Sequence, residues 1–186
     1  MNLPPRSEAL KILDEWVKNP NLKKHMLAVE GVMREYAKIF NEDEECWAQV
    51  GLLHDFDYER YPALENHPFK GVEELKKLGY PEDFLKAILA HAEHTGEPRN
   101  TLLKKTIFAV DELSGFIIAV ALVRPTKKLA EVNVDAVMKK LKEKSFASKV
   151  NREEIFKSAR ELGIELSEHI SNVLNGLKLI HNELAL

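Results

Sequence analysis

The sequence predicts an all-α protein, and three observations lead to this prediction. Apolar residues recur with the three- and four-residue spacing of a helix along nearly the whole chain. No stretch alternates convincingly between apolar and polar residues, so we expect no sheet of consequence. Glycine, proline and asparagine stand where one helical pattern ends and the next begins. Together these features favour a single domain of roughly eight to ten helices.

The expected helices follow one another between residues that are typical of helix ends. Ser7 and Asn66 are predicted N-caps, and Pro68 suits the first turn of the helix that Asn66 opens. Gly79 and Gly163 are predicted stop signals. In chain order, the expected helices cover residues 7–18, 22–40, 47–53, 67–79, 82–91, 101–123, 133–144, 151–162 and 166–184.

Length and composition limit the class of protein. A chain of 186 residues suits one domain with a sizeable core, and we expect residues 1–186 to form it. Cys46 is the only cysteine, which excludes an intrachain disulfide and fits a reducing compartment. The N-terminus has no apolar signal core, and no apolar run approaches the ~20 residues that span a bilayer. We therefore expect a cytoplasmic protein with no membrane partner.

The charge is nearly balanced overall but uneven along the chain. A net charge of −3 argues against a dedicated nucleic-acid binder, so we expect no nucleic-acid partner. Residues 124–160 contain 11 Lys and Arg against 5 Asp and Glu. This basic stretch could steer an anionic substrate, or it could simply be a solvated, lysine-rich helix face.

Several ionisable residues fall on the apolar faces of the expected helices. His25, His54, His91 and Asp111 each follow apolar residues by three or four positions, and His67 begins another helix. A single inward histidine or aspartate is commonly a hydrogen-bonded core residue or a cap. Inward residues on four separate helices need a shared partner, and a divalent metal satisfies them together. Imidazole and carboxylate suit Fe, Mn, Zn or Ni.

The order of these residues resembles the HD-domain superfamily of metal-dependent phosphohydrolases, in its HDIG-type branch. "GLLHDFDYER" resembles the signature in which an apolar run leads to His-Asp, and "NHPFKGVEEL", "AILAHAEH" and "FAVDELSGF" are similar to the segments that follow it. The resemblance covers a core of about 20–123 and leaves a C-terminal helical extension of about 124–186 outside. It implies an all-α, HD-type helical domain with additional C-terminal helices.

The resemblance also implies a set of metal ligands. One ion would be held by His25, His54, Asp55 and Asp111. In branches with two metals, Asp55 would bridge, and the second ion would be held by His67 and His91. Because both extra histidines are present, we expect two divalent ions, drawn from Fe, Mn, Zn, Ni or Mg.

Two positions depart from the common pattern of that branch. Asp57 stands where the branch has glycine, and Tyr58 stands where it often has a lysine that would contact phosphate. Asp57 could add negative charge, act as a general base, or cap the helix end. His94 follows His91 by three residues and could face the same cavity, beside the ligands or toward the substrate. The predicted catalytic residues are therefore Asp55, Asp57 and His94.

The predicted function is hydrolysis of a phosphoester or phosphoanhydride bond in a nucleotide or other small phosphorylated compound, by a metal-activated water. Arg60, Arg124, Lys127 and Lys128 are predicted to bind the substrate, although each could be an ordinary surface charge. Two alternatives remain open. One is a diiron oxygenase of the same superfamily, and the other is a non-catalytic, metal-stabilised module that binds a nucleotide or a partner.

Other residues are expected to orient the predicted histidine ligands. The histidine ligands need acceptors for their second ring nitrogens. The candidate acceptors are Glu30, Asp57, Glu93 and Glu112.

His169 and His181, late in the chain, are interpreted as helix-surface or packing residues.

Overall fold

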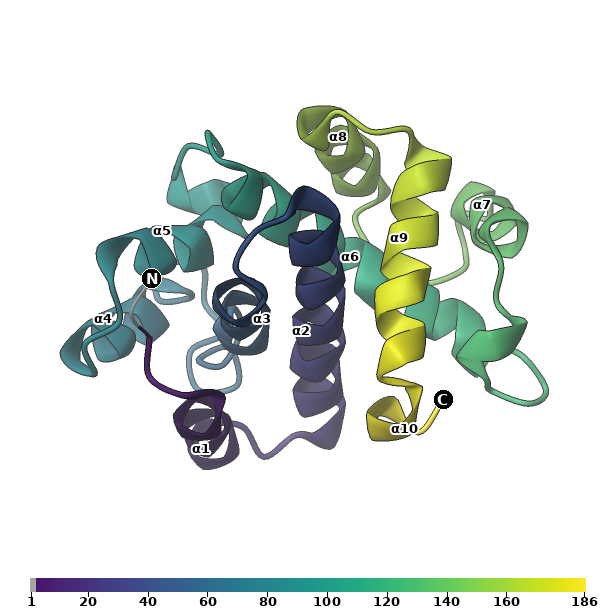
Figure 1. Cartoon of the computed structure of the whole chain (residues 1–186). Helices are drawn as coiled ribbons and strands as arrows, with labels where there is room; N and C mark the ends of the chain where they lie inside the picture. Colours follow the sequence, from purple (N-terminus) through teal and green to yellow (C-terminus); the bar gives the residue numbers. More distant parts are fainter. Residues whose placement is uncertain (1–2) are drawn as a thin grey trace.

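The computed structural model describes residues 3–186 and confirms the all-α prediction, since these residues contain no strand (Figure 1). None of the described helices is long and apolar enough to cross a membrane. The elements are α1 (Arg6–Trp16), α2 (Pro20–Phe40), α3 (Glu44–Leu53), α4 (Phe69–Lys77), α5 (Glu82–Ala90), the 3-10 helix η1 (Glu93–Thr95), α6 (Leu102–Leu122), the 3-10 helix η2 (Leu129–Glu131), α7 (Val134–Lys142), α8 (Arg152–Leu162), α9 (Leu166–Leu179) and α10 (His181–Leu184).

Most helix ends have a local cause in the sequence. Asn19 and Thr101 accept hydrogen bonds from backbone N–H groups in the first turns of α2 and α6, as N-caps do. Asn133 and Asn151 cap α7 and α8 in the same way. Gly163 ends α8 in the left-handed region, at φ 79°, where glycine carries no side-chain penalty.

Three predicted helix ends were wrong. Ser7 is not the N-cap of α1, because the helix begins at Arg6 with Pro5 in that position. The N-cap of α4 is Pro68 instead of Asn66, because turns occupy the chain between α3 and α4. The helix expected over 166–184 breaks at Ile180, whose side chain packs directly on α2.

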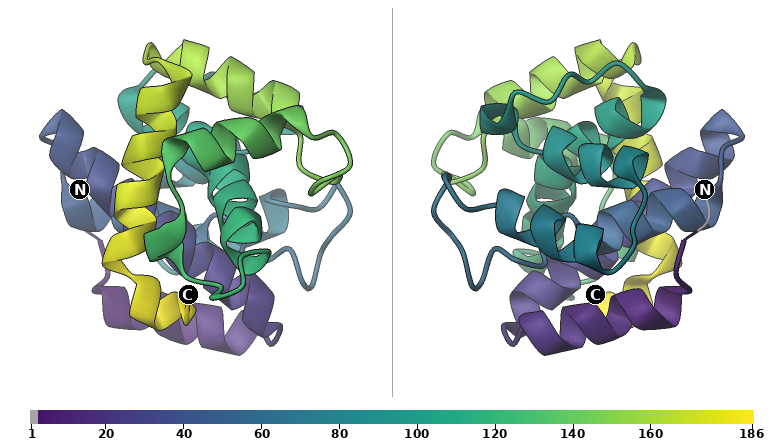
Figure 2. Two further views of the ribbon diagram at one scale, coloured as in Figure 1. Left: turned by 90° about the vertical axis from the view of Figure 1, so that its right-hand side faces the viewer. Right: turned by 90° about the vertical axis from the view of Figure 1, so that its left-hand side faces the viewer.

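The long helix α2 lies at the centre, between α3 on one side and α9 on the other, and α6 crosses behind it (Figures 1 and 2). Two glycines permit this close approach. A Cβ on Gly51 of α3 would lie 2.8 Å from the Val29 carbonyl oxygen of α2, and one on Gly176 of α9 would lie 2.7 Å from the Val32 Cα atom. Glycine is therefore required at both positions.

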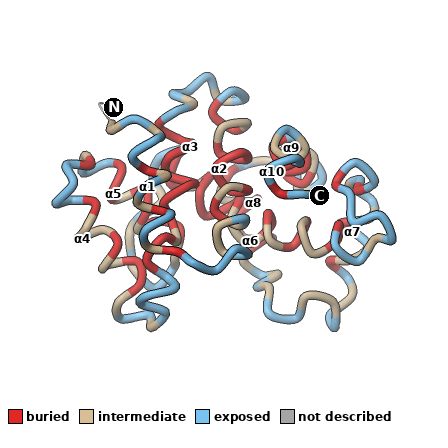
Figure 3. The backbone as a smooth tube through the Cα atoms, turned by 90° about the horizontal axis from the view of Figure 1, so that it is seen from below, coloured by how far each residue is buried: buried red, intermediate tan, exposed pale blue. Residues whose placement is uncertain are grey.

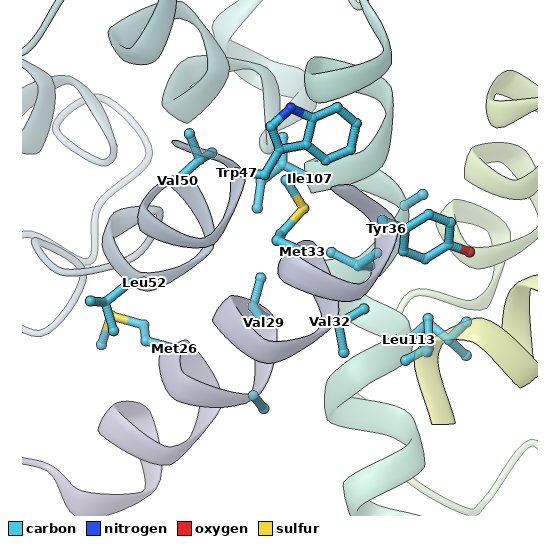
Figure 4. Close-up of a cluster of buried hydrophobic side chains, with 14 of the residues drawn as sticks. Met26, Val29, Val32, Met33, Tyr36, Trp47, Val50, Leu52, Ile107 and Leu113 are labelled. Carbon is cyan, nitrogen blue, oxygen red and sulfur yellow. The ribbon is translucent and has the colours of Figure 1, made fainter. Parts of the chain in front are cut away.

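The buried residues concentrate on α2, α3 and α6 (Figure 3). Met26, Val29 and Met33 of α2 pack among side chains of α3 and α6, including Trp47 and Ile107 (Figure 4). Full burial of a Val or Met side chain contributes about 1.5–3 kcal/mol to the stability of the fold. Apolar residues of α8 and α9 belong to the same buried cluster, so the C-terminal helices share the core of the preceding ones.

His169 of α9 joins this core as a buried polar residue. Its Nε2 atom lies 2.9 Å from the Ala109 carbonyl oxygen of α6, and its Nδ1 atom lies 2.6 Å from the Tyr36 hydroxyl of α2. Because a carbonyl only accepts, Nε2 carries the proton and Tyr36 donates to Nδ1. The residue is fully buried, which agrees with the packing role expected for it.

Candidate metal centre

The six predicted metal ligands lie together at the ends and inner faces of five segments. His25 projects from α2 and Asp111 from α6, while His54 and His91 are the C-cap residues of α3 and α5. Asp55 follows α3 directly, and His67 precedes α4. Placing a histidine at a helix end leaves its ring free to turn away from the packed helix and toward its neighbours.

The first group of donor atoms surrounds His54. The His54 Nε2 atom lies 3.5 Å from Asp111 Oδ1 and 3.7 Å from Asp55 Oδ2. His25 Nε2 lies 2.9 Å from the same Asp111 oxygen. The atoms of His25, His54 and Asp55 that could coordinate a metal all lie within 4.8 Å of one another, a spacing that could hold one ion.

The second group shares Asp55 with the first. Asp55 Oδ1 lies 3.2 Å from His67 Nε2 and 3.3 Å from His91 Nε2, and these two nitrogens are 3.2 Å apart. One oxygen of Asp55 therefore faces each group. This arrangement matches a carboxylate that bridges two ions.

The hydrogen bonds of the rings decide which nitrogen faces the centre. Nδ1 of His54 donates to the Gly51 carbonyl over 2.7 Å, and Nδ1 of His91 donates to the Ile88 carbonyl over 2.5 Å. Nδ1 of His67 lies 2.8 Å from an oxygen of Asp57. In the neutral rings each Nε2 then carries a lone pair that points at other acceptors.

The atoms that face the centre are hydrogen-bond acceptors, and a cation, either a metal ion or a proton, is needed to satisfy them. The buried Nε2 atom of His54 has no hydrogen-bond partner among the described residues. The Nε2 atoms of His67 and His91 face each other and Asp55 without a donor between them unless one ring is protonated. Histidine nitrogens and carboxylate oxygens are suitable ligands for first-row divalent metals, so the residues fit such ions.

Protons can take the place of that cation in the metal-free protein. Burial alone would lower the pKa of His54, but the carboxylates of Asp55 and Asp111 raise it to about 9. Burial likewise opposes the protonation of His67, yet Asp55 and Asp57 raise its pKa to about 9. Despite burial, the neighbouring histidines hold the pKa of Asp55 and of Asp111 well below the usual range.

Asp57, which stands where the resembled motif has glycine, orients a ligand. One of its oxygens bonds His67 Nδ1, and the other accepts from the Gly71 N–H over 2.7 Å. Asp57 is fully buried, and a Cβ on Gly71 would come within 2.9 Å of its Cγ atom. Gly71 lies in the first turn of α4, so Asp57 both caps that helix and aims His67 at the centre.

The other candidate acceptors have different partners. Glu30 pairs with Arg6, and Glu93 pairs with Arg99 and Lys157. Instead, the carbonyls that orient His54 and His91 come from the residues three positions earlier, Gly51 and Ile88. The sequence carries this signal, because a histidine at a helix C-cap can reach the carbonyl of residue i−3.

Glu112 lies next to the ligand Asp111 on α6. Burial, together with the nearby carboxylates of Asp111 and Glu154, raises its pKa to about 7. Its carboxylate accepts a hydrogen bond from the Asn151 backbone, which ties the start of α8 to the helix that carries Asp111.

His94 lies outside both groups of donor atoms. It is exposed on η1, and its Nε2 atom donates to the His67 carbonyl over 2.8 Å. This hydrogen bond fixes the backbone at His67, which is a predicted ligand. A catalytic role for His94 stays a prediction.

The predicted substrate cations are scattered. Arg60 stacks over the Trp16 ring at 4.1 Å and donates to the Glu15 carbonyl, so its guanidinium faces α1. Lys127 and Lys128 line a separate cavity of about 620 Å³ with Lys178 and His181. Arg124 is half-buried at the end of α6. Their role in substrate binding stays a prediction.

The six predicted ligands differ in their exposure to solvent. The side chains of His25, Asp111 and Asp55 are 22%, 20% and 17% exposed, whereas those of His54, His67 and His91 are 0%, 7% and 4% exposed. The centre is therefore accessible to solvent at His25, Asp111 and Asp55. A cavity of about 250 Å³ beside His25 is also lined by Lys24, which no motif in the sequence singles out.

Comparison with known proteins agrees with this geometry. The chain matched no curated protein and no solved structure. The model of the HD domain matches residues 22–115, a range that contains all six predicted ligands. The match does not distinguish the HDIG-type branch, which stays a prediction. Because it extends over half of the chain and ends just after Asp111, the protein belongs to the HD-domain family.

Proposed function

We propose that this protein is a metal-dependent phosphohydrolase that cleaves a phosphoester or phosphoanhydride bond in a small phosphorylated compound. The observation that carries the proposal is the cluster of acceptor atoms around Asp55, which has an open side toward solvent. The HD-domain family, to which the chain belongs, includes metal-dependent phosphohydrolases.

Two divalent ions, drawn from Fe, Mn, Zn, Ni or Mg, fit the residues best. His25, His54 and Asp111 would hold one, His67 and His91 would hold the other, and Asp55 would hold both. Such ions supply Lewis acidity toward phosphoryl oxygens and make a water molecule acidic enough to react near neutral pH.

The residues of the chain prepare this chemistry by orientation and exclusion of water. The carbonyls of Gly51 and Ile88 and the carboxylate of Asp57 keep three imidazole nitrogens aimed at the centre. Both oxygens of Asp57 are occupied by these protein contacts, which supports an orienting role over that of a general base. The burial of His54, His67 and His91 leaves the side at His25 and Asp111 as the route for the substrate.

The test combines metal content with turnover. Protein purified without chelator or affinity metal is analysed by mass spectrometry and assayed with p-nitrophenyl phosphate and bis-p-nitrophenyl phosphate after addition of each metal. We expect close to two ions per chain and metal-dependent hydrolysis. Asp55→Asn should lose metal and lower kcat/KM by more than about 100-fold, beyond the 10–100-fold typical of groups that only orient a ligand.

Asp83→Asn, which changes an exposed aspartate on α5, serves as the matched control and should retain both properties. Bound iron with oxygen consumption and no phosphate release would favour the diiron oxygenase. Bound metal without any turnover would favour a non-catalytic binding module. Full activity in Asp55→Asn would contradict the ligand assignment.

A further inference from the structure

A small, largely apolar cavity adjoins the metal centre on its open side. It has a volume of about 250 Å³ and includes the ligand His25. Its apolar walls come from α6 and from the C-terminal end of the chain, namely Ile118, Leu122, Leu184 and Leu186. The C-terminal helix α10 lies against α2, which brings these segments together (Figure 2).

The cavity continues from the metal centre along one face of α6. Gly115, Ile118 and Leu122 follow the ligand Asp111 by four, seven and eleven positions, a spacing that repeats on one side of a helix. On α2, Asn21 precedes His25 by one turn and also lines the cavity. A molecule held at His25 and Asp111 therefore has this cavity directly beside it.

Gly115 is independent evidence that the space beside His25 is kept open. Glycine within a helix is destabilising relative to alanine, so its presence needs a reason. Of the eight glycines in the chain, Gly115 alone neither has a positive φ nor lies against a neighbour that a Cβ would strike. A Cβ on Gly115 would meet nothing within 4 Å. Glycine at this position keeps the cavity wide.

The remaining glycines all have one of those two structural reasons. A Cβ at four of them would come within 2.9 Å of another atom, and three others have φ values that favour glycine. The first set is Gly31, Gly51, Gly71 and Gly176, and the second set is Gly79, Gly96 and Gly163.

We propose that this cavity binds the organic group of the substrate, and that this group is apolar, either aromatic or aliphatic. The inference rests on the proposed function, which places the phosphoryl group at the metal centre, next to Lys24. A volume of about 250 Å³ is smaller than the roughly 300–1,000 Å³ of pockets that enclose a whole ligand, so it suits part of one. The polar lining residues, Asn21 and Lys24, come from α2, the helix that carries His25. The leucine and isoleucine walls contributed by α6 and the C-terminal end would leave a second phosphate or several hydroxyls without partners.

The cavity also assigns a role to the C-terminal extension. Leu184 and Leu186 complete the wall, and both lie beyond residues 22–115, which match the HD domain. The extension would then determine which organic group the centre accepts, while the HD domain holds the phosphoryl group.

The test compares two non-hydrolysable probes that differ only in their organic group. Methylphosphonate and phenylphosphonate are titrated calorimetrically into the Mn²⁺-loaded protein. We expect the wild type to bind phenylphosphonate at least about tenfold more tightly. Gly115→Leu, which fills the cavity, should reduce this ratio to about twofold or less while the affinity for methylphosphonate changes by less than about twofold. Gly115→Ala should give an intermediate ratio.

Two further variants guard against misinterpretation. Ala130→Leu adds bulk to the cavity that contains Lys127 and Lys128, which shares only Leu186 with the cavity beside His25, and it should leave the ratio unchanged. Leu122→Ser changes a residue that is 48% exposed, so it should fold normally and lower the ratio by about threefold. It replaces Gly115→Leu if that variant does not fold or does not retain metal.

The outcomes separate this inference from the proposed function. Equal affinities for the two probes in the wild type, or an unchanged ratio in both Gly115→Leu and Leu122→Ser, would overturn the inference even if phosphate esters are hydrolysed. The ratio of the two phosphonate affinities could change as expected in a protein that hydrolyses no phosphate compound. That result would support the proposed role of the cavity and overturn the proposed phosphohydrolase function.

Discussion

At the scale of the residue, the geometry of His67 depends on a buried carboxylate. Unlike His54 and His91, which are oriented by carbonyls of their own helices, His67 lies in a segment of turns and is oriented by Asp57. The same carboxylate accepts the Gly71 N–H at the start of α4. A single side chain therefore couples the position of a ligand to the position of a helix.

Asp57→Asn should weaken this coupling. The amide has one acceptor oxygen and one donor nitrogen, so it can accept from His67 or from Gly71 but not from both. We expect the affinity for the ion at His67 and His91 to fall by about 10–100-fold, with the first ion retained. Competition with a fluorescent metal indicator measures both affinities.

The matched control for this substitution is Glu65→Gln, which changes an exposed carboxylate in the same segment of turns. It should leave both affinities unchanged. Equal affinities in Asp57→Asn and the wild type would show that Asp57 acts only as a cap of α4.

At the scale of the element, α9 is joined to α2 and α6 by the neutral ring of His169. Burial lowers the pKa of His169 to about 4, and the hydrogen bond to the Ala109 carbonyl offsets only part of this effect. The Tyr36 hydroxyl donates to the other nitrogen, which a second proton would occupy. Protonation of His169 therefore removes the acceptor for the Tyr36 hydroxyl and weakens the packing of α9 on α2.

Acid should thus destabilise the packing of α9. The unfolded chain binds a proton at His169 with a pKa near 6.5, whereas the folded protein binds it only near 4. The free energy of unfolding should fall as the pH drops from 6.5 to 4, by about 3 kcal/mol in total from this residue. Urea denaturation at several pH values measures this slope.

Two histidine variants show whether His169 causes this change of unfolding free energy with pH. His169→Gln should show a shallower loss of stability over this pH range, whatever its stability at neutral pH. His181→Gln, which removes an exposed histidine on α10, should follow the wild type. Parallel curves for His169→Gln and the wild type would contradict a neutral, buried His169.

At the scale of the whole molecule, the metal centre joins parts of the chain that are far apart in sequence. Its predicted ligands come from α2, the end of α3, the turn before α4, the end of α5, and α6. Ions that bind these ligands together bind the folded state and not the unfolded chain. Metal binding and folding should therefore be coupled.

Chelation should lower the melting temperature of the whole protein. At free metal about 100-fold above Kd, binding stabilises a folded protein by about 2.7 kcal/mol, which for a chain of this length corresponds to ~5–10 °C. Differential scanning calorimetry with and without EDTA measures the shift. Asp55→Asn should melt at one temperature under both conditions, and a wild type unaffected by EDTA would contradict the coupling.

The sequence by itself determined most of the helices and the candidates for metal ligands. Apolar spacing and local caps such as Thr101 and Gly163 act within a few residues, so the positions of most helices could be predicted. Four of the six ligand candidates, His25, His54, His91 and Asp111, were predictable from their places on apolar helix faces. Asp55 and the complete set were implied by the resemblance to the HD-domain superfamily. Five of the six candidates form the two groups that share Asp55, and Asp111 lies within 3.5 Å of His54 and 2.9 Å of His25.

Only the tertiary structure decided what depends on contacts between distant segments. The break at Ile180 follows from its packing on Gly31, and the role of Asp57 follows from the positions of His67 and Gly71. The cavity beside His25 exists because α10 lies against α2, far from it in sequence. Such contacts arise from the packing of whole helices, which local periodicity does not specify.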